Sequence, residues 1–136
     1  MFGHFLLEQG LELELEAEMG EVMDFIDKDM SKFVCGEYGY NVSSGRGVLN
    51  SEWKLMVRSK ELETSTIGKQ PVGYLMVEKL NEYVTKFTIP PRVQWGQEGE
   101  MPTEQEAKLF SSLIFQTLNA FQNRGYIQLP GVLPVE

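Results

Sequence analysis

The sequence predicts a mainly α, single compact domain of three to four helices with a Gly-rich loop or a small hairpin. Two stretches, residues 71–87 and 103–124, place apolar residues at helical spacing. The strong helix formers Leu, Glu, Ala and Met dominate the first 34 residues. The alternative is an α+β fold with a small antiparallel sheet, because some short segments also alternate polar and apolar residues.

The acidic N-terminal segment, residues 1–34, is expected to be helical through most of 5–34, with a bend or break near Gly10 or Gly20. Its second half carries apolar residues on one helical face, from Met19 to Val34. The first half is ambiguous, because leucines and glutamates alternate over 11–17 as they do in a half-buried strand. A strand over 11–17 that leads into a helix is therefore the alternative.

Residues 35–47 are rich in glycine and predict a loop, with room for a short hairpin that pairs 40–42 with 48–49. A helical core is predicted over 51–124. Its first part, 51–63, is predicted as a helix from its Glu, Lys, Leu and Arg content. A strand remains the competing interpretation there, because Trp53, Leu55 and Val57 alternate with polar residues.

Residues 71–87 are predicted as a helix that begins at Pro71 and ends before Pro90, with seven apolar residues at helical spacing. The rival interpretation is a hairpin in which 74–77 pairs with 83–89. Residues 94–102 form a polar linker. A helix over 103–124 follows, with a capping box at Thr103 and Glu106 and a stop at Gly125. The tail, 126–136, is predicted to be extended.

The composition indicates a soluble cytoplasmic protein that folds as one domain over residues 1–136. Its 42% hydrophobic and 24% charged residues are typical of a globular chain. The longest uncharged run, 109–123, is broken by polar residues and is shorter than the roughly 20 apolar residues of a membrane span. The acidic N-terminus does not resemble an export signal, and a single cysteine, Cys35, fits a reducing compartment.

The whole net charge of −8 lies at the N-terminus. Residues 1–30 contain nine acids and one lysine, whereas the other 106 residues are balanced. Such an asymmetry creates a directional field that bears on partners. The candidate interaction residues are the glutamates of this segment together with an arginine and a tryptophan of the linker: Glu8, Glu12, Glu14, Glu16, Glu18, Arg92 and Trp95. For Trp95, an exposed interface anchor competes with packing of the linker onto the core, which is favoured.

No catalytic, cofactor-binding or metal-binding residues are assigned. His4 is the sole histidine, and with Cys35 it supplies too few ligands for zinc and no supported nucleophile–base pair. The glutamates lack the Glu-x-x-His pairs of di-iron bundles. The glycines between Gly36 and Gly47 lack the Gly-Lys-Ser/Thr ending of a phosphate loop. An enzyme is therefore not predicted.

The region 46–92 contains eight bases against five acids, an excess too small for a phosphate-binding surface. If 51–63 and 71–87 were both helices, they would resemble a helix-turn-helix with an overlong link. The sequence therefore disfavours direct nucleic-acid binding.

These observations predict a non-enzymatic, small acidic protein-binding module, such as an adaptor, inhibitor or chaperone-like protein, that engages a basic surface of a partner protein. Seven methionines could supply adaptable apolar contacts. A nucleic-acid mimic, a helix-turn-helix-like DNA binder and a small enzyme that uses only carboxylates are the alternatives. No cofactor and no membrane are expected, and a homo-oligomer stays open.

Overall fold

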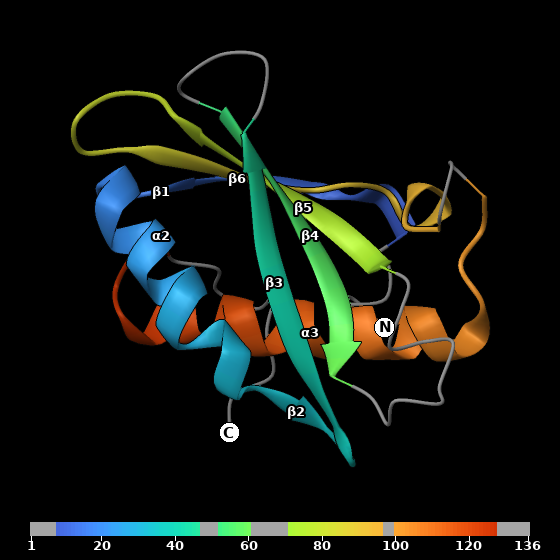
Figure 1. The fold of residues 1–136 in the computed structure, drawn as a ribbon. Coiled ribbons are helices and arrows are strands. Elements are labelled where there is room, and N and C mark those ends of the chain that lie inside the picture. Colours follow the sequence, from blue (N-terminus) through green and yellow to red (C-terminus); the bar gives the residue numbers. More distant parts are fainter. Residues whose placement is uncertain (1–7, 47–51, 61–70, 97–99, 128–136) are drawn as a thin grey trace.

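In the computed structural model, six strands form one antiparallel sheet that curls around two helices (Figure 1). The structure describes residues 8–46, 52–60, 71–96 and 100–127. The order of strands across the sheet is β1-β6-β5-β4-β3-β2. Along the chain the elements are β1 (Leu11–Leu15), α2 (Met19–Lys28), η1 (Met30–Lys32), β2 (Val34–Cys35), β3 (Tyr38–Arg46), β4 (Glu52–Lys60), β5 (Pro71–Lys79), β6 (Thr85–Ile89), η3 (Arg92–Gln94) and α3 (Glu104–Asn123).

The predicted mainly α fold, and with it the description of the protein as helical, is wrong. Among the described residues, only α2 and α3 are α-helices of ten residues or more, and the sheet is the larger framework. The α+β alternative named the antiparallel pairing but underestimated its extent. The error has one source: short apolar segments match helical and strand periods equally well, and the pairing that decides between them is not local.

The predicted helix over 71–87 is instead the hairpin of β5 and β6. Met76 pairs with Thr88 and Val77 with Phe87, as the rival interpretation had it. The turn is closed by backbone bonds from Leu80 and Asn81 to the Val84 carbonyl oxygen. The Asn81 side chain also accepts a bond of 2.7 Å from the backbone N–H of Tyr83. Such local bonds give Asn a preference for turns, and a turn at this position is compatible with the hairpin and not with a continuous helix.

The predicted helix over 51–63 is also a strand in its described part. Residues 53–60 of β4 pair with β3, which occupies most of the predicted Gly-rich loop. Leu55 and Val57 are buried and Trp53 is half-buried, which is the alternation of the competing interpretation. Residues 40–42, which were expected to form a short hairpin with 48–49, pair with residues 57–59 of β4. Residues 48–49 lie outside the described part of the chain.

The helix predicted through most of 5–34 is divided into a strand and a helix. β1 covers Leu11–Leu15 and pairs with β6, so the strand alternative is correct for this part. From Met19 to Lys28 the helical prediction is confirmed, since Val22, Phe25 and Ile26 form the buried face of α2. Beyond Lys28 it is wrong, because the chain continues through η1 into β2. The apolar residues therefore recur at every second position in β1 and at every third or fourth position in α2, and the pattern changes at the connection 16–18.

The predicted helix over 103–124 is confirmed as α3. Thr103 and Glu106 form the expected capping box, with reciprocal bonds of 3.1 and 2.8 Å. Gly125 follows with a φ of +79°, the left-handed conformation that ends helices and that glycine adopts without strain. The predicted tail is described only as far as Ile127, and both Tyr126 and Ile127 are buried.

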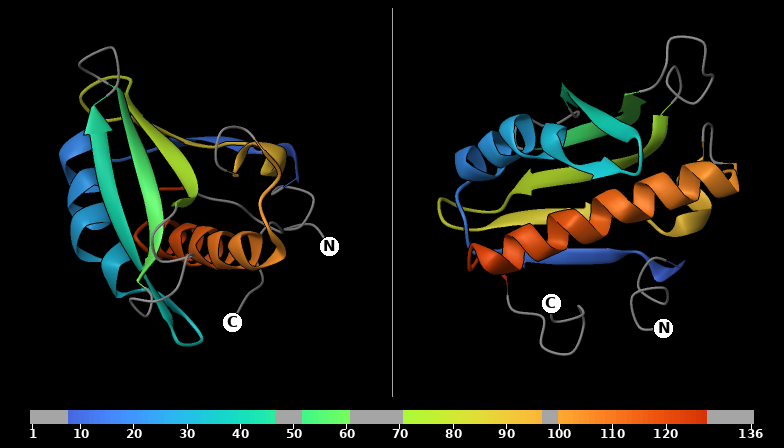
Figure 2. Two further views of the ribbon diagram at one scale, coloured as in Figure 1. Left: turned by 45° about the vertical axis from the view of Figure 1, so that its right-hand side comes forward. Right: turned by 90° about the horizontal axis from the view of Figure 1, so that it is seen from below.

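α3 lies along the concave side of the sheet, with α2 beside it (Figure 2). Phe121 of α3 joins three elements, because its ring centroid lies 5.1 Å from that of Phe25 in α2 and 5.0 Å from that of Phe87 in β6. Nearer the helix start, Phe110 packs edge-on against Trp95, with ring centroids 4.7 Å apart. These buried rings fix the helix against the inner face of the sheet.

Gly73 of β5 makes room for a side chain of α3. An ideal Cβ at this position would lie only 2.5 Å from the ring of Phe110. Phe110 is fully buried and backed by Trp95, so it cannot move aside easily.

We therefore expect Gly73→Ala to lower the free energy of unfolding by about 1–3 kcal/mol, since it overpacks this contact. Gly20→Ala is the matched control, because Gly20 lies in α2 and an added Cβ meets nothing within 4 Å. That control should be neutral or stabilising by up to about 1 kcal/mol, owing to alanine's helix propensity. Urea denaturation measures both values, and equal effects of the two substitutions would contradict the packing argument.

Tyr40 provides a second tie between sheet and helix. Its buried hydroxyl donates a bond of 2.5 Å to the carbonyl oxygen of Leu109 in α3. Burial of this hydroxyl raises the pKa of Tyr40 from the ordinary value of 10.0 to about 12. The neutral side chain is thus favoured in the folded state.

A raised folded-state pKa gives a contribution to stability that is present below pH 10 and is lost as the pH rises through 12. We expect Tyr40→Phe to cost about 1 kcal/mol at neutral pH through the lost hydrogen bond. We also expect this variant to lose less stability than the native protein between pH 10 and 12. Urea denaturation at several pH values tests this. If the free energies of unfolding of the native protein and of Tyr40→Phe changed equally between pH 10 and 12, the raised pKa of Tyr40 would be contradicted.

Candidate functional site

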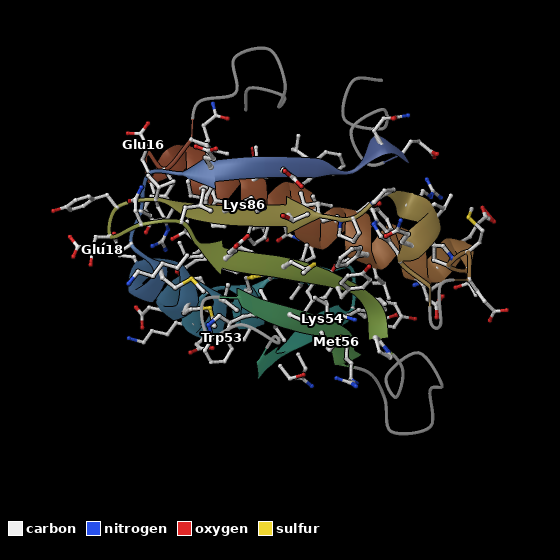
Figure 3. The ribbon with its side chains drawn as sticks, turned by 90° about the horizontal axis from the view of Figure 1, so that it is seen from above. Glu16, Glu18, Trp53, Lys54, Met56 and Lys86 are labelled. Carbon is white, nitrogen blue, oxygen red and sulfur yellow. The ribbon has the colours of Figure 1, made fainter. Side chains whose placement is uncertain are left out.

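The predicted acidic face is divided by the fold into separate groups. In β1, the period of two places Leu13 and Leu15 in the core and leaves Glu12 and Glu14 exposed on the outer face of the sheet. Glu16 and Glu18 follow in the connection to α2, at one end of the molecule (Figure 3). The glutamates therefore do not share one helical face.

The connection that carries Glu16 and Glu18 is held by two hydrogen bonds from distant parts of the chain. The backbone N–H of Glu16 donates to the Tyr126 carbonyl oxygen at 2.8 Å, just after α3. The buried hydroxyl of Thr85, in β6, donates to the Ala17 carbonyl oxygen at 2.8 Å. Because Ala17 itself is buried between the two glutamates, their side chains are directed outward from a fixed backbone.

Glu18 shares a hollow with the turn between β5 and β6. The hollow has a volume of about 430 Å³ and is lined by Glu18, Met19, Gly20, Lys79, Glu82 and Tyr83. Tyr83 is 72% exposed, and the neighbouring Leu80 is 42% exposed. We call Glu16, Glu18, Glu82, Leu80 and Tyr83 the acidic end. It combines three carboxylates with an exposed aromatic ring, and Lys79 is a base beside it.

The acids near the N-terminus differ in whether they are neutralised. Asp24 pairs with Lys28 at 3.1 Å, and Asp29 pairs with Arg124. In contrast, four glutamates are exposed and form no ion pair with a described lysine or arginine: Glu12, Glu14, Glu16 and Glu18. Their charge is thus presented to solvent rather than used within the described fold.

Two of the candidate interaction residues pair with each other. A guanidinium nitrogen of Arg92 lies 3.6 Å from a carboxylate oxygen of Glu8. This pair lies near the start of β1, whereas Glu16 follows its last residue. Glu8 and Arg92 are therefore separated from the acidic end by the length of the strand.

Trp95 is a core residue. It is 1% exposed, and its indole N–H donates to the Pro90 carbonyl oxygen at 2.8 Å. The linker after η3 thus packs onto the core, as the favoured interpretation of this residue had it. Trp95 is not presented as an exposed anchor in this structure.

The helix-turn-helix interpretation is wrong, because its two helices are strands β4 and β5–β6. His4 lies outside the described residues, and Cys35 is half-buried in β2. Within the described ranges, no three side chains of His, Cys, Asp or Glu gather as metal ligands would. No helix in those ranges has the length and apolar character needed to cross a membrane.

Comparison with known proteins gives no relative: no protein-family model, curated protein or solved structure matches this chain. Tyr83 and Leu80 were missed by the sequence analysis, because both were assigned to the apolar face of a helix. Asn81 was the available signal, since Asn favours turns and a turn would have placed its neighbours at a surface.

The acidic end should contribute little to folding, because its side chains are exposed. We expect the double substitution Glu16→Gln and Glu18→Gln, and separately Tyr83→Ala, to change the free energy of unfolding by no more than about 0.5 kcal/mol. Thr85→Val, which removes the buried bond to Ala17, should instead cost about 1 kcal/mol. Urea denaturation measures these values. A large loss in Tyr83→Ala would mean that the ring supports the fold.

Proposed function

We propose that this protein is a non-enzymatic binding module whose acidic end engages a basic segment of another protein. The exposed ring of Tyr83 beside the hollow it shares with Glu18 is the observation that carries this proposal. A largely exposed tyrosine adds nothing to the core, and tyrosine is enriched among residues that dominate binding energy. A cytoplasmic location remains part of the proposal.

The mechanism has two steps. The unpaired carboxylates of Glu16 and Glu18 attract a cationic segment at long range and raise the rate of encounter. Tyr83 then packs against the segment, with its ring face available to a Lys or Arg side chain. Met19, which lines the same hollow, offers a flexible apolar contact.

The rigidity of the surrounding backbone supports this assignment. The Thr85 and Tyr126 bonds fix the connection that carries the glutamates, and the Asn81 bond fixes the turn that carries Tyr83. A surface whose backbone is already ordered loses little conformational entropy on binding. The acidic end is therefore suited to recognise a partner without rearranging.

Site-specific photocrosslinking tests the proposal. A photoreactive amino acid at position 83 should capture a basic protein from a lysate of the cell that makes this chain. Raising the ionic strength from about 50 to about 500 mM shortens the screening length roughly threefold, so capture should fall strongly. Glu16→Gln with Glu18→Gln should reduce capture at position 83 by roughly tenfold.

Two controls separate a site from general charge. Glu37→Gln with Glu104→Gln removes the same charge from two exposed glutamates elsewhere and should leave capture nearly unchanged. The photoreactive group placed at position 37 should not capture the same protein. Equal loss in both double variants, or capture that ignores salt, would refute recognition by the acidic end.

A further inference from the structure

β1 is an edge strand of the sheet. It pairs with β6 on one side, and no described strand lies on its other side (Figure 3). The open side of an edge strand presents backbone N–H and C=O groups without sheet partners, and an extended segment of another chain can pair with them.

The hydrogen bonds of the neighbouring hairpin determine which residues of β1 carry these free groups. In an antiparallel pair, alternate residues direct both backbone groups toward the partner strand. The Leu80 N–H donates to the Val84 carbonyl oxygen at 3.0 Å. This pair continues the register that sets Met76 opposite Thr88. The even-numbered residues of β6 therefore bond to β5, and its odd-numbered residues bond to β1.

The register between β1 and β6 completes the assignment. Leu13 lies opposite Phe87, so the odd-numbered residues of β1 bond to β6. The even-numbered residues, Glu12 and Glu14, therefore direct their N–H and C=O groups to the open side.

A separate hydrogen bond supports this assignment. Glu16 has the same parity as Glu12 and Glu14, and its N–H donates to the Tyr126 carbonyl oxygen rather than to β6. That bond also ends the open side, because the N–H of Glu16 is already used.

The side chains along the open side select a basic partner. Glu12 and Glu14 are exposed, and neither forms an ion pair with a described lysine or arginine. Lys86, which lies opposite Glu14 in β6, forms a salt bridge of 3.2 Å with Glu78 of β5. Residues directly opposite each other in paired strands carry their side chains on the same face, so a Lys or Arg opposite each glutamate would neutralise it.

A second copy of β1 does not suit this edge. Antiparallel pairing of two β1 strands through their free groups sets glutamates opposite glutamates, and like charges directly opposite each other are destabilising. On the inner face, Leu11 is only half-buried and offers an apolar contact to a neighbouring strand. The edge therefore fits a segment that alternates basic and apolar residues.

We propose that the basic segment recognised by the acidic end adds to β1 as a seventh strand of the sheet. Its backbone bonds to Glu12 and Glu14, its Lys or Arg side chains lie on their face, and its apolar side chains lie on the face of Leu11. Beyond β1 the segment continues to the acidic end, which begins at Glu16. This inference rests on the proposed function and adds how the segment is held.

Backbone methylation of a peptide tests the strand addition. The probe is a synthetic peptide that alternates Lys and Val, used with the full chain. Two derivatives carry methyl groups on backbone nitrogens, one at every Lys and the other at every Val. In an antiparallel complex only the lysine nitrogens donate to β1, and in a parallel complex only the valine nitrogens do. One derivative should therefore bind at least about tenfold more weakly than the parent peptide, and the other about equally.

Hydrogen exchange measured by NMR locates the peptide on the chain. The amides of Glu12 and Glu14 should exchange quickly in the free protein and at least about tenfold more slowly with saturating peptide. Leu13 is the control within the same strand, because its N–H already bonds to β6, and its exchange should change little. Slow exchange at both glutamates without peptide would mean that this chain or a second copy covers the edge, and would overturn the proposal.

The charge contacts are tested by Glu12→Gln with Glu14→Gln, which should weaken binding of the parent peptide roughly fivefold. Glu37→Gln with Glu104→Gln is the matched control and should leave binding nearly unchanged. Equal weakening by the two double variants would overturn the proposal.

Failure of the strand addition is distinguishable from failure of the proposed function. If both methylated derivatives bind equally well or equally weakly, or the parent peptide does not bind, the strand addition is refuted, whereas capture at position 83 still stands. If position 83 captures no basic protein, the proposed function itself is refuted.

Discussion

The burial of one side of α3 against the curled sheet is the constraint on which the rest of the structure depends. The helix buries Phe110, Leu113, Leu118 and Phe121, among others, and these side chains need a concave apolar surface. The sheet supplies it with every second residue of its strands, and Gly73 makes room for the ring of Phe110. This contact fixes which side chains of each strand face inward.

The same constraint determines the arrangement of charge. Once Leu13 and Leu15 are turned toward α3, the pleat of β1 places Glu12 and Glu14 on the opposite face. The strand then ends, and the chain continues through Glu16 and Glu18. Hydrogen bonds with Thr85 and Tyr126 hold the backbone of this connection. A run of glutamates that is continuous in sequence is thus divided between two surfaces of different character.

The two surfaces differ in how their charge is used. The acidic end offers unpaired carboxylates beside an exposed ring, an arrangement that favours a cationic partner. On the outer face of the sheet, Lys86 and Glu78 of neighbouring strands pair with each other at 3.2 Å, so part of the charge there is used within the chain.

The sequence by itself determined the elements whose signals are local. Thr103, Glu106 and Gly125 set both ends of α3, and the three- and four-residue spacing of its apolar side chains set its buried side. The concentration of acids near the N-terminus was equally a property of the sequence, whereas the structure decided which of them are exposed and unpaired.

Only the tertiary structure decided the rest, because it depended on pairing between distant segments. The residue pattern of 71–87 fits a helix and a hairpin equally well. The pairing of β5 with β4 and with β6 is what makes it a hairpin. Trp95 became a core residue only because Phe110 and the Pro90 carbonyl group lie beside it in the fold. Likewise, the register that places Leu13 opposite Phe87 and Val42 opposite Val57 joins distant segments, and no local pattern of residues specifies it.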